Sequence, residues 1–449
     1  MRTCTLAAAA LLVLAGAAPA QDAAPVTSRD ALLARARAFD EDDRRFNLLR
    51  LDLARAQERL QLAHEAMAGF TRGKTPADLK KDPALRKEAE RLALEAQAAQ
   101  EAYEALGTGA GRARYVSLRQ RLEGALGPLL RDLERAIEAE DDPGLRLARG
   151  EVLAGKGRFD DARADAEAAI RARPDDPRAL TLLSMCLVTE NRFDEAEALL
   201  ARACELEPTD ERRGYHAIAL YCLNRFAAAR AARDRIASPK QLSAALQVRS
   251  AWWLTDGELD RAEAAWAREE ALRRDEAARD DLPRVELVTS RGALTLELFE
   301  DQVPNAVAGL LELVEAGFYD GLPFSRVVPN LLAQTGDPAA RPGAPAGARH
   351  DPGWRLEDDP GARDPAKHRA HLRGTVSLVC EDAPHSAGSQ LFVTLMPSPA
   401  FDGHHVPVGR VVDGQAVADR LREGDLVERA RVVRKRDHPY AARRAGGPR

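Results

Sequence analysis

A short pattern recurs four times between residues 143 and 274, and its spacing constrains the fold of this region more than any other feature of the chain. The apolar anchors of the copies, at positions 159, 193, 226 and 259, are 34, 33 and 33 residues apart. An internal period of this length is typical of arrays in which each unit is a pair of helices. One pair cannot bury its apolar face alone, whereas stacked pairs can, so we expect a helical array over residues 141–280. The copies are Gly157-Arg158-Phe159, Asn191-Arg192-Phe193, Asn224-Arg225-Phe226 and Gly257-Glu258-Leu259.

The residue types within the copies fit this architecture. Glycine or asparagine at the start of each copy tolerates a left-handed backbone, which suits the turn between paired helices. Ala162 and Ala196 are small enough to let paired helices approach closely. The pattern resembles tetratricopeptide repeats, and this resemblance implies an α-solenoid with a groove for a peptide or protein partner. A spacer is the alternative, and we expect Trp252 and Trp253 in the core rather than at a ligand.

Length and charge limit the class of protein. The chain has 449 residues, more than a single ordinary core accommodates, so we expect a multidomain protein. Its formal net charge is −5, and without a strong basic field nucleic acid is not an expected partner. Ala, Leu, Arg and Glu predominate, which favours helix over most of the length.

Residues 1–20 have the pattern of a signal peptide. Arg2 supplies a positive start, an apolar run of Ala and Leu follows over residues 6–14, and Ala18-Pro19-Ala20 fits a small-residue cleavage site before Gln21. The run is too short to span a bilayer. We therefore expect an exported protein, periplasmic or extracellular, with no membrane span after removal of the signal. An uncleaved anchor or a tail without structure is the alternative.

The segment from residue 21 to residue 140 is expected to form a helical hairpin or short bundle, with a coiled coil as the alternative. The hydroxyl of Ser28 can cap the first helix by accepting a backbone N–H. A break is expected over residues 69–76, followed by helices over residues 83–106 and 116–138. No site chemistry is visible in this segment.

Three cysteines, Cys186, Cys204 and Cys222, lie in the repeat region. Their spacing does not match a zinc site. Export would permit a disulfide among them, whereas separate thiols can pack as small apolar residues, which is the interpretation that we favour.

The periodicity changes from helical to alternating near residue 283. Apolar residues occupy alternate positions on both sides of Ser290-Arg291-Gly292, which indicates a β-hairpin. Apolar residues at helical spacing follow over residues 307–314, with Pro304 before them and Gly317 after them. Strand, strand, helix and further strands are the expected opening of a β-barrel capped by helices.

Residues 324–337, FSRVVPNLLAQTGD, resemble the signature of the cyclophilin-type peptidyl-prolyl isomerases, which usually reads FHRVIPxFxxQGGD. Three later blocks, at residues 374–378, 388–392 and 402–406, are similar to further segments of the family in the same order. The resemblance covers residues 283–437 and implies a cyclophilin-like closed β-barrel capped by helices. It also implies an isomerase of X–Pro bonds in proline-containing polypeptides. A basic tail, residues 438–449, follows.

The resemblance assigns catalysis to Arg326, supported by Gln334, which would hold the substrate backbone. Rotation about an X–Pro bond breaks amide resonance and has a barrier of roughly 18–20 kcal/mol. The twisted amide exposes a nitrogen lone pair, to which a guanidinium can donate more strongly than to the planar amide. Such differential binding lowers the barrier, and it requires no metal or other cofactor.

The same resemblance supplies the substrate-binding residues. Phe392 and His405 match positions that line the proline pocket, and Gln390 matches a polar contact near the peptide. Leu331 replaces a pocket phenylalanine, and Phe401 can fill part of the space that an aromatic residue at position 400 usually takes. We expect an apolar pocket that favours the prolyl ring.

Four positions depart from the family pattern: Ser325, Leu331, Thr335 and Ala400. Less aromatic surface at position 331 implies a shallower pocket and a slower or more selective isomerase. The alternative is a catalytically weak or inactive module that binds proline-containing peptides on a protein-interaction scaffold. A hydrolase is not supported, because Ser389 lacks the context of a nucleophile elbow.

Overall fold

The computed structural model describes residues 28–72, 82–364, 369–381 and 383–445. Contacts divide the chain into two units, one ending at Pro174 and the other beginning at Asp175. The expected signal peptide, residues 1–20, lies outside the described residues.

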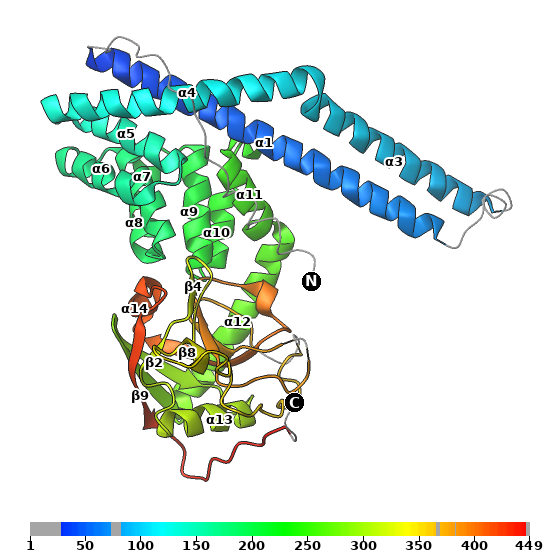
Figure 1. Cartoon of the computed structure of the whole chain (residues 1–449), viewed down its shortest axis with the longest axis vertical. Helices are drawn as coiled ribbons and strands as arrows, with labels where there is room; N and C mark the ends of the chain where they lie inside the picture. The colour runs from blue at the N-terminus through cyan, green and yellow to red at the C-terminus, as the bar shows by residue number, and fades with distance from the viewer. Residues whose placement is uncertain (1–27, 73–81, 365–368, 382, 446–449) are drawn as a thin grey trace. The chain divides into compact units, whose positions relative to one another are not determined.

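The first unit is built of helices. Helix α1 lies along α3 and α4, as expected for a helical hairpin or short bundle (Figure 1). The hydroxyl of Ser28 accepts from the N–H of Ala31 and caps α1, as predicted. Helix α1 continues past the start of the expected break, because one glycine weakens a helix by only about 1 kcal/mol. The bounds are α1 Arg29–Thr71, α3 Pro83–Gly107, α4 Gly109–Ala139, α5 Pro143–Gly155 and α6 Phe159–Ala172.

Helix pairs occur at the expected period in the repeat region. The turn residues Gly157, Asn191 and Asn224 have φ values of 75°, 63° and 61°, which are left-handed as predicted. Ala162 and Ala196 are fully buried between paired helices. The remaining helices are α7 Pro177–Thr189, α8 Phe193–Leu206, α9 Asp210–Cys222, α10 Phe226–Arg233, η1 Pro239–Gln241, α11 Ala244–Trp253 and α12 Asp256–Arg279.

The fourth copy differs from the others. Gly257 lies inside the first turn of α12, and the hydroxyl of Thr255 caps this helix. Trp253 stacks on Tyr221 with ring centroids 6.1 Å apart. Trp252 is 60% exposed, so the expectation of a core position is wrong for this residue. Neighbouring positions on a helix point about 100° apart, and only one of the two rings can face Tyr221.

The rest of the second unit is a strongly curled antiparallel sheet of nine strands, in the order β3-β9-β1-β2-β8-β6-β7-β5-β4. Its two edge strands, β3 and β4, are joined in the chain by only Phe324 and Ser325, which brings the edges close together. The predicted hairpin is present, since Thr289 pairs with Gly292. The strands are β1 Arg284–Thr289, β2 Gly292–Leu298, β3 Leu322–Pro323, β4 Arg326–Val328, β5 Leu332–Thr335, β6 Thr375–Leu378, β7 Leu391–Thr394, β8 Val406–Asp413 and β9 Leu426–Arg434.

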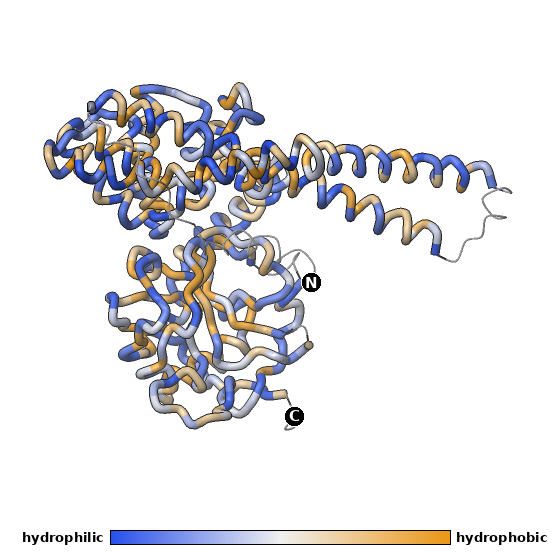
Figure 2. The backbone as a smooth tube through the Cα atoms, turned by 45° about the horizontal axis from the view of Figure 1, so that its top comes forward, coloured by the Kyte–Doolittle hydropathy of each residue, from blue (hydrophilic) through white to orange (hydrophobic). Residues whose placement is uncertain are grey.

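The interior of the curled sheet is apolar, as the colouring of its strands in Figure 2 shows. Alternate residues of β1 and β2, such as Val285 and Leu296, are buried there. Helix α13 (Pro304–Glu315) adds Val307 and Leu311 to the same cluster, as the helical spacing predicted. The remaining short helices are η2 Pro338–Ala340, η3 Pro399–Phe401 and α14 Gln415–Arg420.

Helices of the repeat region and the sheet share contacts within the second unit. Leu372 and Met396, from loops beside the sheet, are buried in the apolar cluster of helices α7 to α12. Arg410 on β8 bonds Glu276 on α12, with the two atoms 2.7 Å apart. The two parts of this unit therefore share a buried interface, although each has its own apolar cluster.

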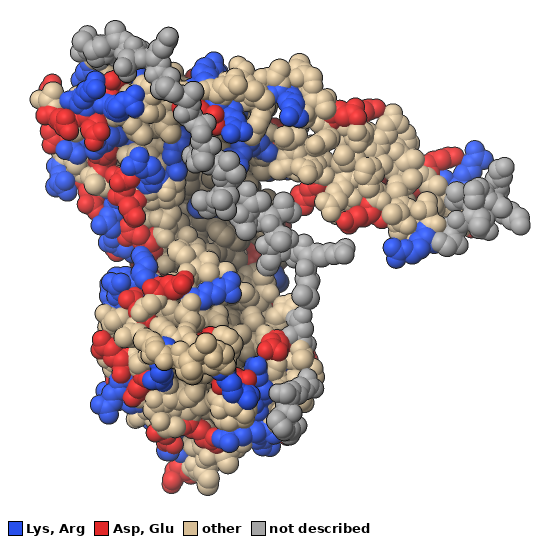
Figure 3. Space-filling view, viewed as in Figure 1, with Lys and Arg blue, Asp and Glu red and all other residues tan. Residues whose placement is uncertain are grey.

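Two further expectations were that the cysteines pack as separate thiols and that the surface carries no strong basic field. Cys186 and Cys222 are buried, and burial raises the pKa of the Cys222 thiol to about 12, consistent with packing as a small apolar side chain. Basic and acidic side chains are interspersed on the face seen in Figure 3. None of the helices in the described ranges is both long enough and apolar enough to cross a bilayer.

Candidate functional site

Strand register places three of the predicted site residues in one row. Arg326 on β4 is the direct partner of Gln334 on β5, and Gln334 is in turn the partner of Phe392 on β7. The row continues to Ser377 on β6. Directly opposed residues of antiparallel strands project to the same face. The predicted catalytic pair and the predicted pocket phenylalanine therefore share one face of the sheet.

The turn between β4 and β5 is formed by local sequence. Pro329 has a fixed φ, and Asn330 adopts a φ of 58°. The N–H of Leu331 donates to the carbonyl of Val328 at 3.1 Å and closes the turn. Proline followed by asparagine suits a type II turn, which needs a positive φ at its third residue and accepts asparagine there as well as glycine. The turn thus fixes the pairing of Arg326 with Gln334.

Glutamine side chains extend the site along the sheet. The Gln334 amide donates to Oε1 of Gln390 at 2.8 Å, and the Gln390 amide donates to the carbonyl of His350 at 2.8 Å. Gln334 and Gln390 are half-buried, whereas Arg326 is exposed on its edge strand. Within the described ranges, no hydrogen bond or ion pair holds the Arg326 guanidinium. The cation remains available to a ligand.

Three predicted pocket residues form one aromatic cluster. Phe392 lies 5.2 Å from both Phe401 and His405, and Phe401 lies 5.4 Å from His405, measured between ring centroids. Phe392 is buried, and the other two rings are half-buried. The backbone carbonyl of Leu331 accepts from the N–H of Leu395 at 2.9 Å, which anchors the residue, and its contact with a prolyl ring stays a prediction.

His405 is held as a neutral imidazole. The backbone N–H of Cys380 donates to its Nδ1 at 3.2 Å, so Nε2 carries the proton of the neutral ring. Burial lowers the pKa of His405 to about 4, and the nearby His371, His404 and Arg363 act in the same direction. The aromatic cluster therefore contains an uncharged imidazole at neutral pH.

The sequence analysis missed His371. Its buried ring stacks on Phe392 at 6.0 Å, with the two planes 14° apart. Its Nδ1 lies 2.7 Å from a carboxylate oxygen of Asp402, and its Nε2 lies 2.9 Å from the hydroxyl of Ser377. The His371 ring thus packs against Phe392 while Asp402 and Ser377 hold its two nitrogens. His371 lies outside the matched sequence blocks, so the sequence carried no signal for this contact.

Two residues near the signature are structural. The hydroxyl of Thr335 donates to the carbonyl of Pro323, and that of Ser389 donates to the carbonyl of Gly336. Both hydroxyls are fully buried, which agrees with the expectation that Ser389 is not a nucleophile. Gly336 has a φ of 88°, and a Cβ there would lie 2.2 Å from the Ser389 carbonyl oxygen, so only glycine fits.

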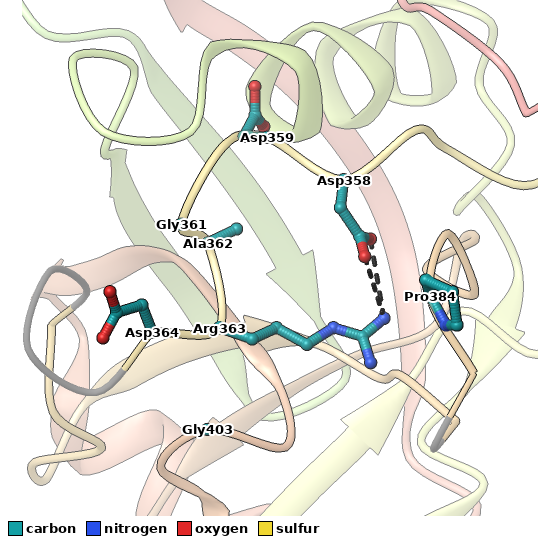
Figure 4. A pocket seen from close by; sticks show the side chains of 8 residues that line it. All are labelled: Asp358, Asp359, Gly361, Ala362, Arg363, Asp364, Pro384 and Gly403. Carbon is teal, nitrogen blue, oxygen red and sulfur yellow. Dashed lines mark hydrogen bonds and ion pairs between the residues drawn. The ribbon is translucent and has the colours of Figure 1, made fainter.

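A hollow of about 440 Å³ is lined in part by Gly403, which lies in the loop between Phe401 and His405 (Figure 4). Arg363 crosses it and pairs with Asp358. None of the seven predicted site residues lines it. The lining residues are Asp358, Asp359, Gly361, Ala362, Arg363, Asp364, Pro384 and Gly403.

Comparisons with known proteins locate the similarity. The family profile described as "Cyclophilin type peptidyl-prolyl cis-trans isomerase/CLD" matches residues 284–438, and a tetratricopeptide repeat profile matches residues 147–211. "Peptidyl-prolyl cis-trans isomerase-like 1" of Aspergillus fumigatus is 34% identical over 135 residues, which cover 30% of this chain and 78% of that protein. The "Peptidyl-prolyl cis-trans isomerase" of Synechococcus elongatus is 33% identical over 149 residues, covering 33% of this chain and 94% of that protein.

Among solved structures, cyclophilin AquaCyp293 from Hirschia baltica aligns at 24% identity with a TM-score of 0.29, covering 33% of this chain and 73% of that chain. Each of these two curated relatives matches about a third of the chain. The seven predicted site residues all lie within residues 284–438, which the cyclophilin-type profile matches.

Proposed function

Because the chain belongs to the cyclophilin-type peptidyl-prolyl cis-trans isomerase family, we propose that it accelerates X–Pro rotation in exported client proteins. One observation supports this proposal above the others. The strand register sets the exposed cation of Arg326 in the same row as Gln334 and Phe392. This is the arrangement that a prolyl isomerase needs, with a donor beside an apolar pocket.

The mechanism follows from this geometry. The rings of Phe392, Phe401 and His405 receive the prolyl ring and exclude water that would stabilise the planar amide. Gln334 holds the substrate backbone. Arg326 donates to the proline nitrogen as the amide twists, and this bond is stronger in the twisted state than in the planar one. Each 1.36 kcal/mol by which the barrier falls gives about a tenfold faster rate.

A peptide-binding module with little turnover is the second candidate. Ser325 and Leu331 stand where the family has histidine and phenylalanine, and these changes reduce the polar and aromatic contacts available to a substrate. In this case the aromatic cluster would still bind proline-containing segments, and the helical repeats would provide most of the interactions with a protein partner.

The decisive experiment is an isomerisation assay on a short X–Pro peptide by NMR exchange, with no coupling protease. We expect Arg326→Ala to lower the catalysed rate about 100-fold, because it removes the donor to the developing lone pair. The matched control is Arg431→Ala, which removes an exposed arginine from β9 of the same sheet. Equal, uncatalysed rates for wild type and Arg326→Ala would reject the enzyme, and retained peptide binding would then favour the second candidate.

Export is proposed from the signal pattern alone, namely Arg2, the apolar run at residues 6–14 and Ala18-Pro19-Ala20. When the full chain is produced in a bacterium, we expect the mature protein outside the cytoplasm to begin at Gln21. Mass spectrometry of the intact chain measures this. Deletion of residues 2–20 is the control and should retain the protein inside, whereas an uncleaved chain in the cytoplasm would contradict export.

A further inference from the structure

A repeat helix pair directly contacts the turn that pairs the proposed catalytic residues. The N–H of Asn330, at the tip of the β4–β5 turn, donates to Oδ1 of Asn191 at 2.6 Å. Asn191 lies in the turn between α7 and α8, at a separation of 139 residues along the chain. Asn330 itself lies between the strands that carry Arg326 and Gln334. The hydrogen bond that anchors Asn330 therefore acts on the hairpin that carries both Arg326 and Gln334.

The side chain of Asn191 is built into the interface. It is fully buried, and its amide nitrogen donates to the carbonyl of Asp419 at 2.9 Å. The carboxylate of Asp419 is in turn fixed by the Arg373 guanidinium through bonds of 2.7 and 2.8 Å. A single side chain thus joins the β4–β5 turn to α14 through two hydrogen bonds, a part-buried one to Asn330 and a buried one to Asp419.

The other repeat turns show whether the asparagine side chain is needed for the left-handed backbone of the turn or for the hydrogen bond to Asn330. Gly157, Asn191 and Asn224 all have left-handed backbones. Gly157 is exposed, with open space where a side chain would lie. Glycine is thus sufficient for the turn itself. The side chain of Asn191 is therefore needed for its hydrogen bonds to Asn330 and Asp419 rather than for the shape of the turn.

We propose that Asn191 is a positioning residue for isomerisation, which holds the Pro329–Asn330 turn and thereby the alignment of Arg326 with Gln334. This inference rests on the proposed function. It makes the repeat array part of the active unit, because the edge strand β4 pairs with a single strand, β5, among the described residues. An edge hairpin without the Asn191 bond would hold Arg326 less firmly beside the pocket.

The test uses the full chain with Asn191→Gly, which keeps the left-handed turn and deletes only the side chain. We expect kcat/KM for a short X–Pro peptide to fall about fivefold and the amide of Asn330 to exchange at least tenfold faster with solvent. The matched control is Asn224→Gly, which removes a side chain that bonds the N–H and carbonyl of Arg373 instead of the hairpin. This control should keep kcat/KM within twofold of wild type.

A second variant separates the two bonds of Asn191. Asn191→Asp keeps an acceptor for the Asn330 N–H but loses the donor to the Asp419 carbonyl, so it should retain most of the wild-type kcat/KM. Equal losses in Asn191→Asp and Asn191→Gly, or in Asn191→Gly and Asn224→Gly, would overturn the inference, as would unchanged exchange at Asn330. Wild-type protein without any catalysed exchange would instead reject the proposed function, and the inference with it.

Discussion

Phe401 packs against both Phe392 and His405, although the aromatic residue that is common in the family lies one position earlier. Ala400 at that earlier position is exposed. The aromatic surface has thus moved by one residue along the chain and still closes the cluster. Leu331 has no such compensation among the ring contacts of the described residues. At the scale of single residues, therefore, the side of the pocket at Leu331 is where we expect weaker binding of the prolyl ring.

His405 provides a pH prediction at the same scale. Its pKa is about 4 in the folded chain and about 6.5 when exposed, so between these values the unfolded chain binds more protons. Above pH 6.5 the imidazole is neutral in both states, and His405 does not lower the free energy of unfolding. As pH falls from 6.5 towards 4, protonation of the unfolded chain lowers this free energy. The loss should be on the order of 2 kcal/mol, allowing for solvent screening of a half-buried ring.

Urea unfolding of wild type and His405→Asn between pH 4 and pH 7.5 measures this effect. Carboxylates titrate in the same range, so the informative quantity is the difference between the two proteins. The wild type should lose more of its free energy of unfolding than the variant as pH falls. Parallel curves would show that the imidazole is not held neutral by the fold.

At the scale of elements, the sequence predicted segments that carry a motif or a regular apolar spacing better than it predicted loops. Alternation and the Ser290-Arg291-Gly292 turn located the β1–β2 hairpin, and apolar spacing located α13. Arg326 and Gln334, both in the signature, lie close together because they are eight positions apart on one hairpin. His371 reaches the pocket from a segment without periodicity or motif, so only tertiary packing reveals it. The sequence likewise indicated the left-handed turn at Asn191 but not its bond to Asn330.

At the scale of the whole molecule, the repeat helices and the sheet of the second unit keep separate apolar cores but meet through buried side chains. Met396 and Leu372 are buried among the repeat helices, and Glu269 and Glu276 of α12 are buried against Arg369 and Arg410. Charges buried in this way are tolerated only when they are paired. The helices and the sheet of this unit should therefore unfold together rather than as separate domains.

The tryptophans allow this cooperativity to be measured, because Trp266 reports on α12 and Trp354 reports on a loop packed against the core of the sheet. In single-tryptophan variants, the two fluorescence transitions in urea should coincide. Glu276→Gln should destabilise the unit by about 3 kcal/mol and separate the transitions, because it leaves Arg369 and Arg410 buried with less opposing charge. Glu270→Gln, an exposed change on the same helix, is the matched control and should alter neither. Transitions that are already separate in the parent protein would mean that the helices and the sheet unfold independently. The contact between Asn191 and the β4–β5 turn could then be lost without unfolding either part.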